Sequence, residues 1–253
     1  MQLPDYCFYA TLLDAFRNYV DSELIYEHYW GWSENPPHTL DEFREMQFQS
    51  LINTLNRVPF DSEAADKGTA FNEVVDCLIE KRMSEKVEMS RVYNDDVLTG
   101  IKAVYNDREF IFPIALCKEF ANYYKGAITQ LYVEAMLPTS LGIVKLYGFI
   151  DELMPTSIHD IKTTGSYYVG KFKKHYQHLV YPYCLINSGN NIKTFEYNVA
   201  EIGKSGYKTY TELYEFNEER DIPILRNHCE ELIRFIQDNR DLVTNKKLLN
   251  INE

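Results

Sequence analysis

Three consecutive segments between residues 127 and 164 alternate apolar with polar side chains and are separated by short turns that contain proline. Alternation with a period of two predicts half-buried β-strands, and short proline-containing breaks predict antiparallel pairing of neighbouring strands. The segments read AITQLYVEAML, LGIVKLYGFIDEL and TSIHDIKTT, and the turns lie at Pro138-Thr139-Ser140 and Met154-Pro155-Thr156. The chain is therefore expected to build its centre on an antiparallel sheet.

The segments around this block alternate between helical and strand periodicity. Apolar residues at helical spacing predict helices over residues 5–30, 40–57 (with Thr39 as N-cap), 69–83, 114–125, 167–186 and 222–240. Shorter strands are expected at VEMSRVY, TGIKAVY and REFIFP, and over residues 193–202 and 207–216. This order predicts an α+β fold of the α/β class.

The organisation along the chain indicates a single domain over residues 1–253. Within it we expect a helical N-terminal part (1–60), a core (61–217) and a C-terminal helix (218–253), because no repeat or low-complexity tract marks a linker. A chain of this length buries a full core without disulfides or a structural metal.

Charge and cysteine usage limit the classes of function. A formal net charge of -12 argues against binding nucleic acid through the overall field, so any such contact needs a local basic patch. The five cysteines show no metal-binding spacing, which favours a reduced, intracellular setting. The first residues lack the basic region of a secretory signal, and no apolar run is long enough for a bilayer, so we expect a cytoplasmic protein without a membrane partner.

Acidic and basic side chains meet at the second proline turn. Asp160 and Lys162 lie two apart on a strand and share a face, whereas Ile161 points into the core. If the turn centres near Met154 and Pro155, antiparallel pairing places Asp151 opposite residues 158–160. Two carboxylates and an ammonium group then converge.

This constellation suits phosphodiester hydrolysis. Two carboxylates at close range repel unless a cation lies between them, so Mg²⁺ or Mn²⁺ is expected at Asp151 and Asp160. Such a metal polarises the phosphoryl oxygen and activates water, and Lys162 positions the water or offsets charge. The alternative is a plain hairpin with an exposed Asp-Lys pair.

Four motifs together carry a family resemblance. Gly148-Phe149-Ile150-Asp151 and His159-Asp160-Ile161-Lys162-Thr163 resemble the G-x-x-D and D-x-K-T strands of the RecB-type branch of the PD-(D/E)XK nucleases. Residues 67–73 (KGTAFNE) look like that branch's G-T-x-x-H-E helix, and residues 177–181 (QHLVY) look like its Q-x-x-x-Y helix. The motifs stand in the family's order but span less than half of the chain.

The resemblance implies a restriction-endonuclease-like core, a mixed central sheet flanked by helices, and metal-dependent cleavage of DNA. It implies an exonuclease of recombination, repair or a phage-like element. The catalytic residues that the resemblance implies are Asp151, Asp160, Lys162, Gln177 and Tyr181. The metal ligands that it implies are Asp151, Asp160, Ile161 and Glu73. Substrate contacts are expected from Lys171, Lys173, Lys174 and Thr163, and a homo-oligomer is compatible with this family.

Two departures from the family pattern bear on activity. Asn72 stands where many relatives carry a metal-ligating histidine, so Glu73, or no residue of this helix, completes the coordination. Relatives with an iron–sulfur cluster close it with clustered cysteines, which this chain lacks, and we expect no cluster.

Other classes of protein fit less well. The run Gly165 to Phe172 nearly matches a phosphate-binding loop, but Phe172 replaces the hydroxyl that would ligate Mg²⁺. Neither an HExxH nor a G-x-S-x-G motif occurs. The remaining alternative is a DNA-binding or assembly protein that keeps the nuclease fold without its chemistry.

Overall fold

The computed structural model describes residues 3–204 and 206–250 and is built on a mixed sheet. Its strands are β1 (Tyr6–Tyr9), β5 (Ile128–Thr139), β6 (Gly142–Leu153), β7 (Ser157–Thr164), β8 (Thr194–Gly203) and β9 (Gly206–Glu215). The order is β1-β6-β7-β8-β9, and β5 also pairs with β6. β5, β6 and β7 are consecutive antiparallel strands, as the alternation predicts, whereas β1–β6 and β7–β8 are parallel. The prediction of a mixed sheet flanked by helices is confirmed.

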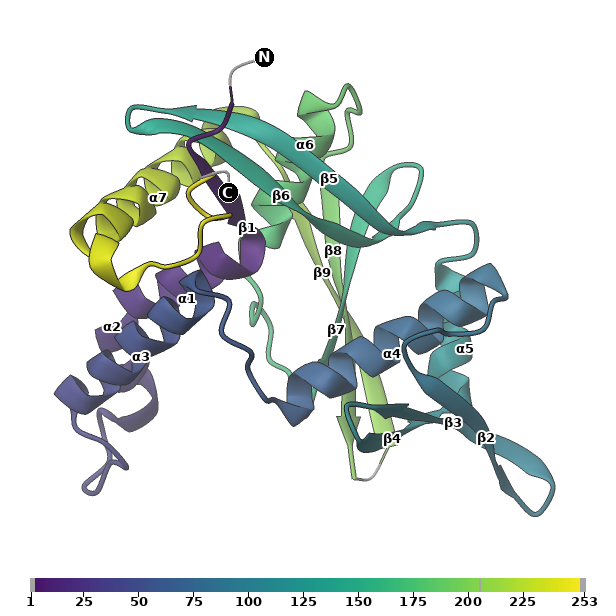
Figure 1. Cartoon of the computed structure of the whole chain (residues 1–253). Helices are drawn as coiled ribbons and strands as arrows, with labels where there is room; N and C mark the ends of the chain where they lie inside the picture. The colour runs from purple at the N-terminus through teal and green to yellow at the C-terminus, as the bar shows by residue number, and fades with distance from the viewer. Residues whose placement is uncertain (1–2, 205, 251–253) are drawn as a thin grey trace.

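One face of the sheet packs on the larger hydrophobic core. This core joins the strands to α1 (Ala10–Val20), α3 (Leu40–Leu55), α6 (Gln177–Asn187) and α7 (Glu218–Asp238), with α2 (Ser22–Trp30) beside α3. Figure 1 shows the N-terminal helices grouped at one side of the molecule, next to α7. The N-cap predicted at Thr39 is confirmed, and it forms a capping box at the start of α3, because Thr39 and Glu42 bond reciprocally.

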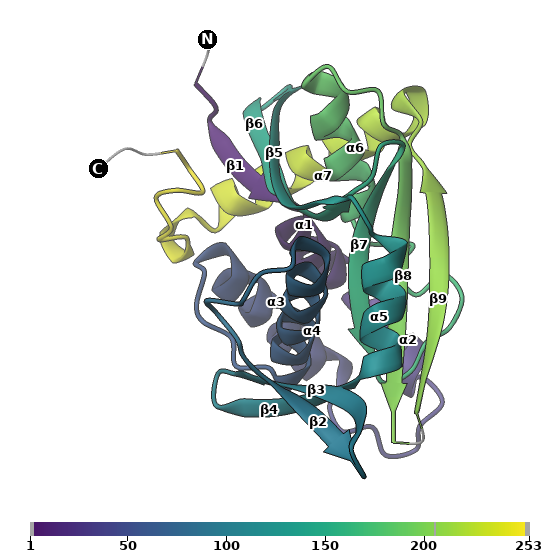
Figure 2. The same cartoon turned by 90° about the vertical axis from the view of Figure 1, so that its right-hand side faces the viewer.

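The other face of β7 and β8 packs on a second core. This core contains α4 (Glu63–Glu80), α5 (Ile114–Tyr123) and a separate antiparallel sheet of β2 (Glu88–Asn94), β3 (Val97–Tyr105) and β4 (Arg108–Pro113). Ile161 and Ala200 are the buried residues through which β7 and β8 join it. Figure 2 shows α5 in front of β7 and β8, with α4 beside it. β7 is thus covered on both faces.

Three predicted boundaries are wrong. Residues 6–9 form the strand β1 and not the start of a helix, because they pair with β6. α4 begins at Glu63, inside the expected loop, since the Ser62 side chain accepts a hydrogen bond from the Ala65 amide. The expected helix 167–186 is helical only from Gln177, and Pro182 lies within it.

Two predicted properties of the whole chain can be compared with the structure. None of the described helices combines the length and apolar character that crossing a membrane requires. All five cysteines are unpaired, and all but Cys7 are buried.

Candidate active site

The candidate site lies where β6 and β7 separate. Their pairing consists of Glu152 with His159 and Leu153 with Ile158, which confirms the predicted register, and the strands then diverge. On the same edge of β6, pairing with β1 ends at Tyr147. The edge of β6 from residue 148 to residue 151 therefore has no strand neighbour there among the described residues. Asp151 lies at the inner end of this opening.

Asp151 is held between a helix and the neighbouring strand. Its Oδ2 accepts hydrogen bonds from the Asn72 Nδ2 of α4 at 3.0 Å and from the Ile161 backbone amide of β7 at 2.9 Å. Asn72 stands where the family resemblance leads one to expect a metal-ligating histidine, and here it orients the Asp151 carboxylate. Two donors on one oxygen favour the ionised form of the carboxyl group.

Asp160, Lys162 and Gln177 form a closed set of contacts. Lys162 Nζ lies 2.7 Å from Asp160 Oδ2 and donates to Gln177 Oε1 at 2.7 Å. The Gln177 amide in turn donates to Asp160 Oδ1. Asp160 is only 2% exposed. Because Ile161 faces the second core, the predicted sharing of one strand face by Asp160 and Lys162 is confirmed.

The electrostatics of the site follow from burial and from the proximity of the two acids. Burial raises the pKa of Asp151, and the neighbouring Asp160 raises it further. Burial also raises the pKa of Asp160, although Lys162 opposes the shift. Burial disfavours the ammonium form of Lys162, but Asp160 outweighs this effect and raises the pKa of Lys162 above its ordinary value. Lys162 is therefore a fixed cation and not a base in this arrangement.

Tyr181 joins the site from α6. Its ring rests on β6 at Gly148, where an added Cβ atom would lie 2.7 Å from Tyr181 Cε1. Burial, followed by the charge of Asp160, raises the pKa of its hydroxyl group. Gln177 and Tyr181 are one helical turn apart, so α6 presents both to the site as the i, i+4 spacing predicts.

Glu73 pairs with an arginine, whereas Thr163 faces α4. Glu73 is buried, and its Oε1 lies 2.6 Å from Arg82 Nη1, in an ion pair that turns it away from Asp151. No contact described here joins it to Asp151 or Asp160, so the structure does not bring it into the predicted metal set. The Thr163 hydroxyl faces Gly68 of α4, at 3.5 Å from where a Cβ atom would lie.

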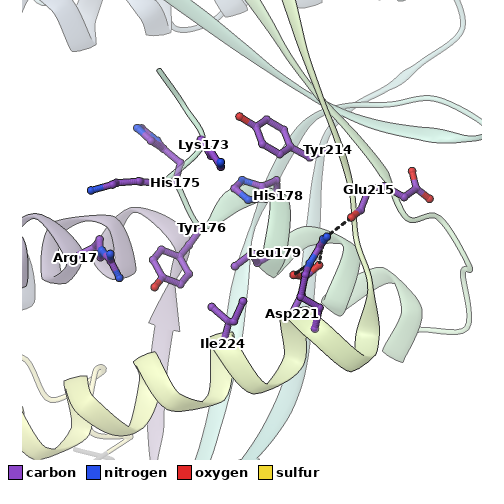
Figure 3. Close-up of a pocket in the computed structure, with 12 residues that line it drawn as sticks. Arg17, Lys173, His175, Tyr176, His178, Leu179, Tyr214, Glu215, Asp221 and Ile224 are labelled. Carbon is purple, nitrogen blue, oxygen red and sulfur yellow. Dashed lines mark hydrogen bonds and ion pairs between the residues drawn. The ribbon is translucent and has the colours of Figure 1, made fainter. Parts of the chain in front are cut away.

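The predicted substrate-binding lysines lie in the turns before α6 and not on a helix. Lys171 donates to Thr164 Oγ1 at 2.6 Å, and Lys174 pairs with Asp21 at 2.9 Å. Lys173 and Lys174 line a pocket of about 410 Å³ at the start of α6, together with Arg17 and Arg220. Figure 3 shows Lys173 and His175 on the segment that leads to Tyr176, at the rim of this pocket.

The residues present fit a hard divalent cation. Asp160 Oδ2 and Asn72 Oδ1 are buried and accept no well-aligned hydrogen bond from any described residue, although Lys162 Nζ lies near the former. Such oxygens are the ligands that Mg²⁺ and Mn²⁺ prefer. No group of three or more His, Cys, Asp and Glu side chains within residues 3–204 and 206–250 is arranged around a common point. A bound metal would accordingly rest on Asp151 and Asp160, with backbone or amide oxygens completing its shell.

A buried acid pair next to the site was missed by the sequence patterns. Asp76, one turn after Asn72 on α4, and Glu152, next to Asp151 on β6, are 1% and 0% exposed. Burial raises the pKa of both groups. The only available signal is the four-residue spacing of Asn72 and Asp76, which places both on one helix face.

Comparisons with known proteins add little to this geometry. No family model matches the chain, and no curated protein matches it. A solved structure described as "Crystal structure of SSO0001" superimposes on 91% of this chain and 78% of that chain, with 10% sequence identity and a TM-score of 0.42. A superposition this loose carries no inference about function.

Proposed function

We propose that the protein is a Mg²⁺- or Mn²⁺-dependent nuclease that hydrolyses phosphodiester bonds of DNA. The observation that carries the proposal is the closed Asp160–Lys162–Gln177 set beside Asp151, at the opening between β6 and β7. A partly buried ammonium group next to two carboxylates, one of them in an ion pair with it, suits a site where a phosphate and a cation meet.

Each residue has a separate task in this mechanism. Asp151 and Asp160 would hold the metal, which would polarise the phosphoryl oxygen and lower the pKa of a water. Lys162 keeps its positive charge and stabilises the negative charge that develops on the phosphoryl oxygens. Gln177 bonds both the ammonium group of Lys162 and one oxygen of Asp160 and so fixes their positions. Asn72 and the Ile161 amide fix the carboxylate of Asp151.

The proposal is tested by incubating the protein with linear and with closed circular DNA in Mg²⁺, Mn²⁺ or EDTA. We expect cleavage only with a divalent metal, and cleavage confined to linear DNA if the enzyme is an exonuclease. Lys162→Ala should lower the rate at least about a hundredfold, the usual effect of losing a group that stabilises transition-state charge. Lys118→Ala is the matched control, because Lys118 is exposed on α5 and is not among the residues assigned to the site. Cleavage that survives both EDTA and Lys162→Ala would contradict the mechanism.

A second function is favoured by one observation. The Asn72 amide occupies one oxygen of Asp151, where a metal-ligating histidine is expected from the family resemblance. A protein that binds DNA without cutting it is therefore the alternative. Metal-independent binding with no cleavage in either metal would favour this alternative, whereas restored or increased cleavage in Asn72→His would favour the nuclease.

A further inference from the structure

A long groove separates the N-terminal helices from β6. Its volume is about 1070 Å³. One wall comes from α1, α3 and the chain that follows α3, including Arg57 and Phe60, and the other comes from residues 147–149 of β6. Figure 1 shows this connecting chain running from α3 toward the start of α4.

The groove leads to the candidate site. Tyr147, Phe149 and Asp151 alternate along β6 and share one face, and the first two line the groove. Tyr181 lines it as well, and it lies one helical turn from Gln177, whose amide donates to Asp160. The inner end of the groove thus coincides with the unpaired edge of β6.

The lining of the groove is electrostatically unlike the rest of the molecule. The chain carries 38 acidic residues among 253, yet none of the described residues that line the groove is acidic. Its one guanidinium group, that of Arg57, lies 5.2 Å from the centre of the Tyr9 ring and donates to the Tyr147 hydroxyl. A polyanion in the groove is therefore repelled by no acidic side chain of the lining and is attracted by one cation, that of Arg57.

Aromatic rings stand exposed on both walls. The exposed fraction is 85% for Phe60 and 55% for Phe149, and the Tyr132 ring lies 5.2 Å from that of Phe149. Exposed phenylalanine rings gain nothing from water, whereas unpaired nucleobases stack on such rings regardless of sequence. A double helix offers no free base faces, and its affinity depends on many phosphate contacts to Lys and Arg.

We propose that this groove binds single-stranded DNA and guides it to Asp151 and Asp160. The cleavage of the bound strand rests on the proposed nuclease function, whereas the binding of the strand does not. Phe60 and Phe149 stack bases, Arg57 contacts a phosphate, and the amides of Gln49 and Asn53 on α3 offer hydrogen bonds to base edges. Single-stranded regions or ends, and not intact duplex, are then the substrate class.

Binding is tested without catalysis, by fluorescence anisotropy of a labelled oligothymidylate in EDTA. We expect the single strand to bind more tightly than a closed DNA hairpin of the same phosphate count. Phe60→Ala and Phe149→Ala should each weaken single-strand binding at least about fivefold, the lower end of the effect of losing one stacking ring. Tyr93→Ala is the control, because Tyr93 is 54% exposed on β2, outside the groove. Tighter binding of the hairpin, no binding to either, or no effect of both substitutions would overturn the proposal.

A second measurement guards against variants that fail to fold. Photocrosslinking of an iodouracil-substituted oligonucleotide to the unaltered protein should give adducts within residues 57–60 and 147–149, and adducts confined to other segments would overturn the proposal. The two proposals can fail independently. If the protein binds single strands through Phe60 and Phe149 but does not cleave DNA in Mg²⁺ or Mn²⁺, the groove proposal is supported and the nuclease proposal is rejected. If cleavage depends on metal but neither substitution changes cleavage or binding, the nuclease proposal is supported and the groove proposal is rejected.

Discussion

Gly148 is the residue of β6 on which the ring of Tyr181 rests. An added methyl group would lie 2.7 Å from Tyr181 Cε1 and 3.3 Å from its hydroxyl oxygen, well inside the distance at which carbon atoms attract. The glycine of one motif and the tyrosine of another are thus the two halves of a single contact. This contact fixes α6, and with it Gln177, against the strand that carries Asp151.

Replacing Gly148 with alanine should therefore strain the contact. We expect Gly148→Ala to lower the free energy of unfolding by about 1–3 kcal/mol, the usual cost of overpacking a buried site. Urea denaturation measures this change. Gly165→Ala is the control, because a Cβ atom there meets nothing within 4 Å. Equal stability of the two variants would show that Tyr181 moves aside without cost.

Gln177 acts on the site through Lys162 and Asp160. Removing its amide in Gln177→Ala leaves the ammonium group without one fixed acceptor and Asp160 without one fixed donor. We expect cleavage to slow by about 10- to 100-fold, as is typical when a residue that orients a metal ligand is lost. Gln237→Ala, on the exposed side of α7, should leave the rate unchanged in the same assay. An unaltered rate in Gln177→Ala would exclude this positioning role.

At the scale of elements, α4 and β6 meet through two buried acids. Asp76 of α4 and Glu152 of β6 are almost inaccessible, and neither Glu152 oxygen accepts a hydrogen bond from a described residue. Burial, followed by their mutual interaction, raises the pKa of Glu152, and burial raises that of Asp76. The pair therefore keeps a proton at a pH at which free carboxyl groups have lost theirs.

This pair makes the stability of the protein dependent on pH. Because the native carboxyl groups hold protons that the unfolded chain has released, stability is complete below the ordinary pKa of a carboxyl group and falls as pH rises from there. We expect Glu152→Gln to flatten this decline between pH 5 and 9 and to raise the free energy of unfolding at pH 9 by at least about 1.4 kcal/mol, which corresponds to one pKa unit. Denaturation at several pH values measures it.

The exposed Glu85→Gln variant is the control for that experiment, because it removes one acidic group outside the buried pair. A decline in stability with pH that is the same in Glu152→Gln and Glu85→Gln would show that Asp76 and Glu152 are not its source.

At the scale of the whole molecule, the proposed binding of DNA would bring a polyanion to an acidic protein. With a formal net charge of -12, the overall field repels DNA, and the groove contributes a single guanidinium group, that of Arg57. Affinity must then come mainly from stacking, which salt does not screen. Binding through the groove should consequently depend only weakly on ionic strength.

The salt dependence of oligothymidylate binding tests this. The logarithm of the binding constant should fall with the logarithm of salt concentration at a slope of about -0.7 for each phosphate neutralised, hence about -0.7 for one arginine. Arg57→Gln should bring the slope close to zero. A steep slope that Arg57→Gln leaves unchanged would place the binding on Lys171, Lys173 and Lys174 instead.

The sequence by itself determined the features that depend on neighbours along the chain. Period-two alternation and the two breaks specify the antiparallel order of β5, β6 and β7, although Pro138 and Thr139 themselves pair within β5 and not in the turn. The turn at Met154 sets the register of Glu152 with His159. The same alternation places Asp160 and Lys162 on one face. Each of these follows from backbone geometry over a few residues, which a sequence pattern records directly.

Only the tertiary structure decided what each polar side chain contacts. Asn72 and Glu73 are adjacent on α4, but Asn72 contacts Asp151 and Glu73 contacts Arg82. The two contacts differ because α4 lies between the opening of β6 and β7 and the chain that follows α4. Tyr6 to Tyr9 form a strand because the edge of β6 offers hydrogen bonds that outweigh local helical preference. The groove likewise exists only where distant segments meet, and packing between such segments leaves no periodic trace in the sequence.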